Sequence, residues 1–90
     1  MLVFHMKRFK VEYISNIRKA AYVLVRCVGD FEFEIMDGST LGPLDLKAVI
    51  NQPRALKENG SLDLSLFALY PKDRGKLELI SVGDVLELKE

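Results

Sequence analysis

Residues 61–68 carry the hydrophobic period on which the fold prediction depends, and they read Ser61-Leu62-Asp63-Leu64-Ser65-Leu66-Phe67-Ala68. Apolar and polar side chains alternate along most of this stretch. A strand accommodates the alternation because successive side chains point to opposite faces, whereas a helix would scatter the leucines around its axis. The stretch therefore predicts a strand with Leu62, Leu64, Leu66 and Ala68 on one face.

The same period of two recurs on both sides of this stretch and predicts further strands. Turn-forming pairs punctuate the pattern: Gly29-Asp30, Asp37-Gly38 and Asn59-Gly60 are residue pairs that readily adopt tight turns. The first of these pairs predicts a hairpin between the second and third strands. The predicted strands lie at Phe9 to Tyr13, Ala21 to Val28, Phe31 to Ile35, Leu77 to Leu79 and Leu86 to Leu88.

Residues 41–58 allow two interpretations. Leu44, Leu46, Ala48 and Ile50 alternate as in a strand, yet a helix capped by Asp45 is also compatible with the pattern. Pro53 ends either element. We favour a strand from Leu44 to Ile50 and an irregular or single-turn segment over residues 52–58, because the period-two match is the more complete.

The spacing of the predicted strands indicates an all-β fold. Six or seven short strands joined by tight turns in 90 residues are typical of a small closed or nearly closed β-barrel of antiparallel strands. The length leaves room for a single domain spanning residues 1–90. Residues 71–75, with the sequence Pro-Lys-Asp-Arg-Gly, predict an exposed hairpin loop whose tip points into solvent.

Charge and composition limit the classes of function. Thirteen basic and thirteen acidic residues cancel, so binding to nucleic acid would need a local basic patch. The densest basic stretch, Lys7 to Lys10, is followed by Arg18 and Lys19, and we interpret both as solvated strand edges. The longest apolar run, Ala20 to Val25, is cut by Arg26 and is too short to cross a bilayer. We expect no membrane association.

No arrangement of residues predicts catalysis, a metal site or a cofactor. The lone His5 has no acid or nucleophile near it in sequence, and Cys27 sits in an apolar run that favours an inert thiol. A single cysteine excludes an internal disulfide and fits a reducing compartment. The opening run Met1 to Phe4 is too short for a signal peptide, so we expect a cytoplasmic protein. Because no catalytic arrangement is evident, we also expect that it is not an enzyme.

The order of the predicted strands resembles the second-domain β-barrel of the translational GTPases, which include elongation factor Tu. The resemblance is carried by Leu62 to Leu66, by the loop at residues 71–75, and by Ile80-Ser81-Val82-Gly83-Asp84-Val85-Leu86. Leu46 to Ile50 resembles the strand of these barrels that carries a lysine before an apolar pair. The Gly-x-Gly-like stretch that usually opens the barrel is replaced by Asn16 to Ala20. No phosphate-binding Gly-x-x-x-x-Gly-Lys motif is present, so the resemblance implies contacts with RNA or protein and no GTP hydrolysis.

The candidate partner-binding residues cluster around the predicted exposed loop. Loops held by a rigid scaffold often carry recognition, and tyrosines can stack on a base or on a partner's side chain. On a strand, Glu32 and Glu34 share one face and predict an acidic stripe suited to a basic partner. The candidates are Tyr70, Lys72, Asp73, Arg74 and Lys76 at the loop, with Tyr22 and Arg26 on a neighbouring strand.

These observations predict a non-catalytic binding module that contacts RNA or protein, with a role in translation implied by the resemblance. The alternative is a structural or regulatory subunit that forms homo-oligomers or pairs with another chain through an exposed strand edge. Aliphatic residues on both faces of Val23 to Val28 favour this alternative. A small enzyme with its site between subunits is a third interpretation, which no nucleophile–base pair supports.

Overall fold

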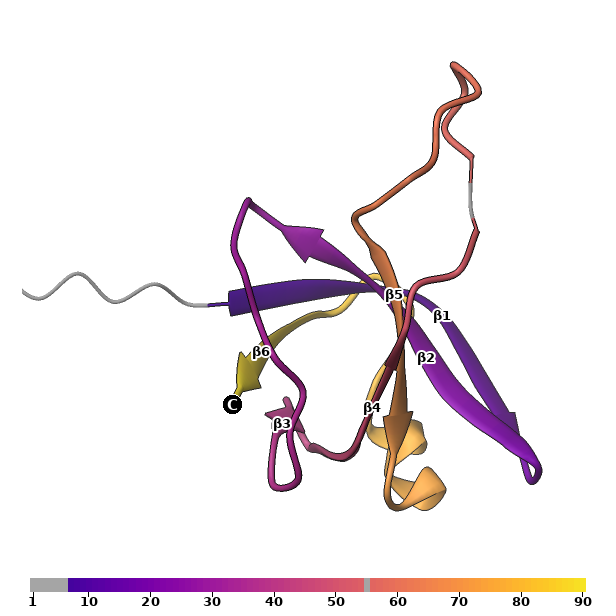
Figure 1. Cartoon of the computed structure of the whole chain (residues 1–90). Coiled ribbons are helices and arrows are strands. Elements are labelled where there is room, and N and C mark those ends of the chain that lie inside the picture. Colours follow the sequence, from indigo (N-terminus) through magenta and orange to yellow (C-terminus); the bar gives the residue numbers. More distant parts are fainter. Residues whose placement is uncertain (1–6, 55) are drawn as a thin grey trace, which may run out of the picture.

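The fold is a six-stranded antiparallel barrel with one short 3₁₀ helix, η1, across the residues that the structure describes (Figure 1). The computed structural model describes residues 7–54 and 56–90, so His5 lies outside the described residues. The elements are β1 Lys7–Ile17, β2 Ala20–Val28, β3 Thr40–Leu41, β4 Leu44–Asn51, β5 Leu66–Pro71, η1 Arg74–Leu79 and β6 Val85–Lys89.

The barrel closes in the order β1-β2-β5-β4-β3-β6, with β6 pairing back onto β1. The predicted all-β barrel is therefore confirmed. Phe9 and Val11 of β1 and Val23 and Val25 of β2 are fully buried, because alternate side chains of each strand point into the barrel. Leucines from the other elements complete the core: Leu41, Leu44, Leu46, Leu69, Leu77 and Leu88. No helix among the described residues is long and apolar enough to span a membrane.

The longest pairing is the hairpin of β1 with β2, whose turn is Arg18-Lys19 between the paired Ile17 and Ala20. The predicted hairpin between residues 21–28 and 31–35 is therefore wrong, since β2 pairs with β1 and β5. A register shift between Val11 and Tyr13 interrupts the alternation of β1. The extra residue reverses the faces beyond it, which leaves Tyr13 half exposed on the outer surface.

Residues 31–35 are not a strand, contrary to the prediction, but they keep the predicted alternation. Phe31, Phe33 and Ile35 are partly buried against the core, while Glu32 and Glu34 are exposed. The segment crosses from the end of β2 to β3 as an extended chain (Figure 1). Period two correctly identified its buried face, but hydrophobic alternation alone does not provide a neighbouring strand with which to pair.

The stretch at residues 61–68 is a strand only in its second half, because β5 begins at Leu66. Leu62 and Leu64 are exposed, the latter by 65%, whereas Asp63 between them is buried. Both leucines belong to a loop over residues 52–65 that projects away from the barrel at the end opposite η1 (Figure 1). The predicted strand start at Leu62 is wrong. The ion pair of Asp63 with Arg26, described below, buries the aspartate and directs the neighbouring leucines outward.

The predicted strand at Leu77 to Leu79 is also wrong, because these residues belong to η1. Leu77 is 2% exposed and Leu79 is 67% exposed, while Ile80, three residues after Leu77, is again buried. This spacing of three is the period of a 3₁₀ helix. The side chain of Asp73 caps the first turn by accepting a hydrogen bond from the amide of Gly75 at 2.9 Å.

Two other predictions from the second half of the chain are confirmed. The segment from Leu44 to Ile50 forms β4, so the helical alternative is excluded. The Gly83-Asp84 pair makes the turn that enters the closing strand, with Gly83 at φ +97° and Asp84 Oδ2 accepting the amide of Ser81 at 2.8 Å. This conformation suits glycine because it has no Cβ to clash.

Candidate functional site

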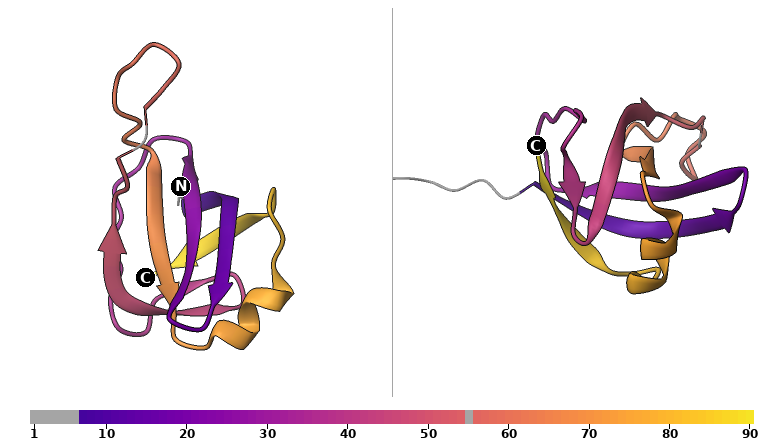
Figure 2. Two further views of the ribbon diagram at one scale, coloured as in Figure 1. Left: turned by 90° about the vertical axis from the view of Figure 1, so that its right-hand side faces the viewer. Right: turned by 90° about the horizontal axis from the view of Figure 1, so that it is seen from below.

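The β1–β2 turn and the β5–η1 connection, together with β4, line a hollow of about 320 Å³ at one end of the barrel. The β1–β2 turn and η1 lie at this same end (Figure 2). We call this feature the basic hollow. It is lined by Arg18, Lys19, Ala20, Ala21, Lys47, Tyr70, Pro71, Lys72 and Arg74.

Five of the lining side chains are cationic, and none of the lining residues is acidic. Lys72 forms an ion pair with the exposed Asp37, which lowers the pKa of that carboxyl. Across residues 7–54 and 56–90, no ion pair involves Arg18, Lys19, Lys47 or Arg74. Four like charges without an ion-pair partner raise the local positive potential, which favours the approach of anions.

A row of three tyrosines runs across the outside of the barrel from the basic hollow. Tyr70 of β5 lines the hollow, and its ring centroid lies 6.5 Å from that of Tyr22 on β2. The ring of Tyr22 lies 6.1 Å from that of Tyr13 on β1. We call these residues the tyrosine stripe. Each ring comes from a different strand, so the rigid sheet sets the spacing of the stripe.

The structure brings together four of the seven residues that the sequence predicts as partner-binding. Tyr70, Lys72 and Arg74 line the basic hollow, and Tyr22 joins them through its contact with Tyr70. Two others act within the fold: Asp73 caps η1, and Lys76 Nζ pairs with a carboxylate oxygen of Asp45 at 2.8 Å. Of the predicted exposed hairpin loop at residues 71–75, residues 72–75 are exposed, whereas Pro71 is buried at the end of β5. The hairpin itself is wrong, because η1 begins at Arg74.

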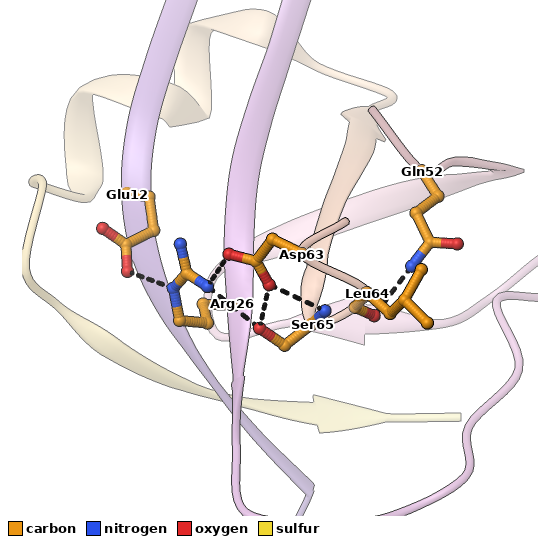
Figure 3. Close-up of polar contacts among 6 residues, drawn as sticks. All are labelled: Glu12, Arg26, Gln52, Asp63, Leu64 and Ser65. Atoms are coloured by element: carbon orange, nitrogen blue, oxygen red, sulfur yellow. Dashed lines mark hydrogen bonds and ion pairs between the residues drawn. The ribbon is translucent and has the colours of Figure 1, made fainter. Parts of the chain in front are cut away.

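Arg26, the seventh predicted residue, lies outside this group and is bound in a network of its own (Figure 3). Its Nε donates to a carboxylate oxygen of Glu12 at 3.0 Å, and its Nη1 donates to Asp63 and to the hydroxyl of Ser65. The backbone amide of Ser65 also donates to Asp63. The guanidinium thus joins β1 and β2 to the segment that precedes β5.

The carboxylate of Asp63 is 7% exposed and accepts hydrogen bonds from two residues (Figure 3). The hydroxyl of Ser65, the Arg26 guanidinium and the Ser65 amide together hold the pKa of Asp63 far below its usual range. A nearby cation and hydrogen-bond donors stabilise an ionised carboxylate over its neutral form. A further hydrogen bond, from the Gln52 amide to the carbonyl of Leu64 at 2.7 Å, ties the two ends of the loop over residues 52–65 together.

Cys27 is partly buried against the core, and burial raises the pKa of its thiol. A raised pKa keeps the sulfur protonated at neutral pH, which makes it a poor nucleophile. Within the described part of the chain, no group of three or more His, Cys, Asp or Glu side chains is arranged to hold a metal ion.

Sequence reasoning missed three cationic lining residues of the basic hollow, namely Arg18, Lys19 and Lys47. A signal for two of them was present, because Arg18-Lys19 is a basic pair between two strands, at the position of a hairpin turn. Lys47 gave no such signal. It lies on β4 and reaches the site through the strand order β2-β5-β4, which a local pattern does not reveal.

No protein-family model, curated protein or solved structure gives a significant match to the chain.

Proposed function

We propose that the chain is a non-catalytic module that binds single-stranded RNA at the basic hollow and along the tyrosine stripe. The observation that carries this proposal is the convergence of five cations on one hollow that also contains the first ring of an outward row of tyrosines. The lining holds no cysteine, histidine, serine or carboxylate that could act on a substrate.

The charges account for attraction to a polyanion. Clustered cations repel one another, and phosphates that bind among them remove this repulsion and release counterions to solution. Arg18 and Lys19 contribute from the hairpin turn, while Arg74 contributes from the start of η1. Because these side chains come from separate elements, the cationic surface is held in place by the barrel and not by one loop.

The tyrosines account for the preference for a single strand. Unpaired bases expose their faces and stack on aromatic rings, whereas the bases of a duplex are already stacked on one another. Tyr13 and Tyr22 extend the stripe beyond the hollow, so a strand whose backbone enters the hollow can lay its bases on the stripe. The resemblance to the barrel of translational GTPases is what favours RNA over DNA.

The test is the affinity for a fluorescently labelled single-stranded RNA, measured by anisotropy over a series of salt concentrations. Neutralising four to five phosphates predicts a slope of log K against log salt of about −3, at about −0.7 per phosphate. The variant Arg18→Gln with Arg74→Gln should reduce the steepness of this slope by about 1.4. Lys57→Gln, a cation of the projecting loop outside the hollow, is the matched control and should leave the slope unchanged.

Tyr22→Ala distinguishes stacking from simple charge attraction. Loss of one stacked base should weaken binding by roughly 5- to 100-fold with an unchanged salt slope. The absence of binding at low salt, or equal affinity for the wild type and the Arg18/Arg74 variant, would refute the proposed function. An equal affinity for duplex RNA would refute the role of the stripe.

A further inference from the structure

The closed barrel has its shortest ladders where β4 and β6 are bridged by the two residues of β3. On β4, this short strand pairs with Leu44 and Asp45 only, and the Leu46 amide then donates to the carbonyl of Ser39 at 3.0 Å. Beyond that point, the ladder partners of β4 among the described residues lie on its β5 side, at Ile50 and Asn51, and the pairing with β5 is irregular between Leu46 and Ile50. Residues 47–51 therefore present an open strand edge, which is a template for another strand.

A groove of about 580 Å³ lies at the end of this open edge. Its floor is aromatic: the ring of Phe33 packs edge-on against Phe9 and Phe67, with centroids 4.9 Å apart in both pairs. These rings are held by the core, so the floor is preformed. We call this feature the phenylalanine groove. It is lined by Lys7, Phe31, Glu32, Phe33, Glu34, Ile50, Phe67 and Glu90.

The rim of the phenylalanine groove is acidic. Three carboxylates face a single cation, Lys7, whose ammonium already pairs with Glu90. Neither Glu32 nor Glu34 forms an ion pair within residues 7–54 and 56–90. Phenylalanines alternate with these glutamates along residues 31–34, so apolar and acidic positions follow one another at the spacing of an extended chain.

We propose that the phenylalanine groove binds an extended segment of another protein in which basic residues alternate with aliphatic residues. The segment adds to the open edge of β4 at residues 47–51, and its main-chain groups use the unpaired ladder positions. Its aliphatic side chains enter the groove over Phe33 and Phe67, and its basic side chains meet Glu32 and Glu34. The phenylalanine groove itself shares no lining residue with the basic hollow, whereas Lys47, at the start of the open edge, also lines the hollow.

Charge complementarity selects this occupant over two others. A second copy of the chain that paired edge to edge would bring the two sets of carboxylates together, and like charges at an interface disfavour association. A nucleic acid is disfavoured for the same reason, since its phosphates would face Glu32 and Glu34. A basic and aliphatic segment instead satisfies both the floor and the rim.

The probe is a short, labelled peptide that alternates lysine with valine, and the readout is fluorescence anisotropy with the full chain. Three peptides of the same length are the controls: glutamate in place of lysine, serine in place of valine, and N-methylation of alternate amides. The glutamate peptide removes the favourable charge, the serine peptide removes the apolar contact, and the N-methylated peptide removes the main-chain hydrogen bonds. We expect each one to bind at least about tenfold more weakly than the probe.

The matched protein variants exchange charge on exposed residues, so folding is preserved. Glu32→Lys with Glu34→Lys should weaken binding of the lysine–valine peptide at least about tenfold and make the glutamate–valine peptide the better ligand. Glu78→Lys, a similar change on exposed η1, should leave both affinities within about twofold. Perturbed amide resonances at residues 31–34 and 47–51 are expected when the peptide is added.

Three outcomes overturn the proposal. The first is an unchanged affinity after reversal of Glu32 and Glu34, and the second is equal binding of the N-methylated peptide, which excludes strand addition. The third is a dimer that sedimentation detects without peptide and that the lysine–valine peptide dissociates, which makes a second copy the occupant.

Discussion

Positive charge is neutralised by ion pairs near one end of β2 and is largely unpaired at the other end. Near one end, Arg26 is held by Glu12, Asp63 and Ser65, so its charge is compensated within the fold. At the other end, Ala20 and Ala21 lie at the floor of the basic hollow, where most of the cations have no counter-charge among the described residues. An arginine paired with acidic residues holds segments of the chain together, whereas a cluster of unpaired cations is repulsive, and an anionic ligand can remove that repulsion.

This difference explains why exposure alone does not identify a binding residue. The side chain of Arg26 is 38% exposed, which is enough to suggest a surface role, yet its contacts with Glu12, Asp63 and Ser65 are all internal. Its function is to fold the segment that contains Asp63 and Ser65 against the barrel. Arg18 and Arg74 form no ion pair with any residue of 7–54 and 56–90, and both line the basic hollow.

The largest expected contrast is in stability. Arg26→Met should lower the free energy of unfolding by about 1–2 kcal/mol, because it leaves the buried Asp63 without its cation, and the partial exposure of the guanidinium limits the loss. Arg18→Met should change this free energy by less than about 0.5 kcal/mol. Urea denaturation of the two variants measures both. Equal losses would show that the comparison of the two cations is wrong.

A smaller effect is expected from acidification. Since the folded pKa of Asp63 lies far below its unfolded value, the folded state binds this proton less readily than the unfolded state. The stabilisation is complete above about pH 5 and declines as the pH falls through about 4 and below. The difference in unfolding free energy between the wild type and Asp63→Asn should therefore shrink over this range, as followed by urea denaturation at several pH values.

The control for acidification is Asp37→Asn. Asp37 pairs with Lys72 on the surface, and that ammonium lowers the pKa of its carboxyl, but an exposed pair contributes little to stability. The difference in unfolding free energy between the wild type and Asp37→Asn should change less with pH than the corresponding difference for Asp63→Asn. A steeper change for Asp37→Asn would place the acid-sensitive contact at the basic hollow instead of at Arg26.

Sequence patterns predicted the barrel where the hydrophobic face coincided with a paired strand, as in β2 and β6. They failed at Leu64, because the ion pair of Arg26 with Asp63 buries the polar residue and turns its apolar neighbours outward. Period two could not show this, since the two partners are 37 residues apart in sequence. The competing signal at η1, an aspartate cap before apolar residues spaced by three, was local and could have been recognised.

The candidate site was predicted in part for a similar reason. Tyr70, Lys72 and Arg74 are adjacent in sequence, and their composition already indicates an exposed loop. The other side of the basic hollow depends on strand order, because Arg18 and Lys47 reach it from the hairpin turn and from β4. Tertiary order is needed to bring three separate basic positions into one hollow, and a single sequence does not determine it.

The smallest effect tests whether the cations of the basic hollow repel one another. Lys47→Gln removes one like charge from the group, so it should raise the free energy of unfolding by about 0.2–0.5 kcal/mol at low salt. The gain should vanish at high salt, where these interactions are screened, and Lys57→Gln on the projecting loop should show no gain in either condition. If Lys47→Gln instead destabilises the chain at low salt, the charge of Lys47 is already compensated in the fold and the contrast between the two ends of β2 fails. Neutralising Lys47 should also weaken RNA binding. A variant that is more stable but binds RNA more weakly would show that this lysine contributes to binding at the expense of stability.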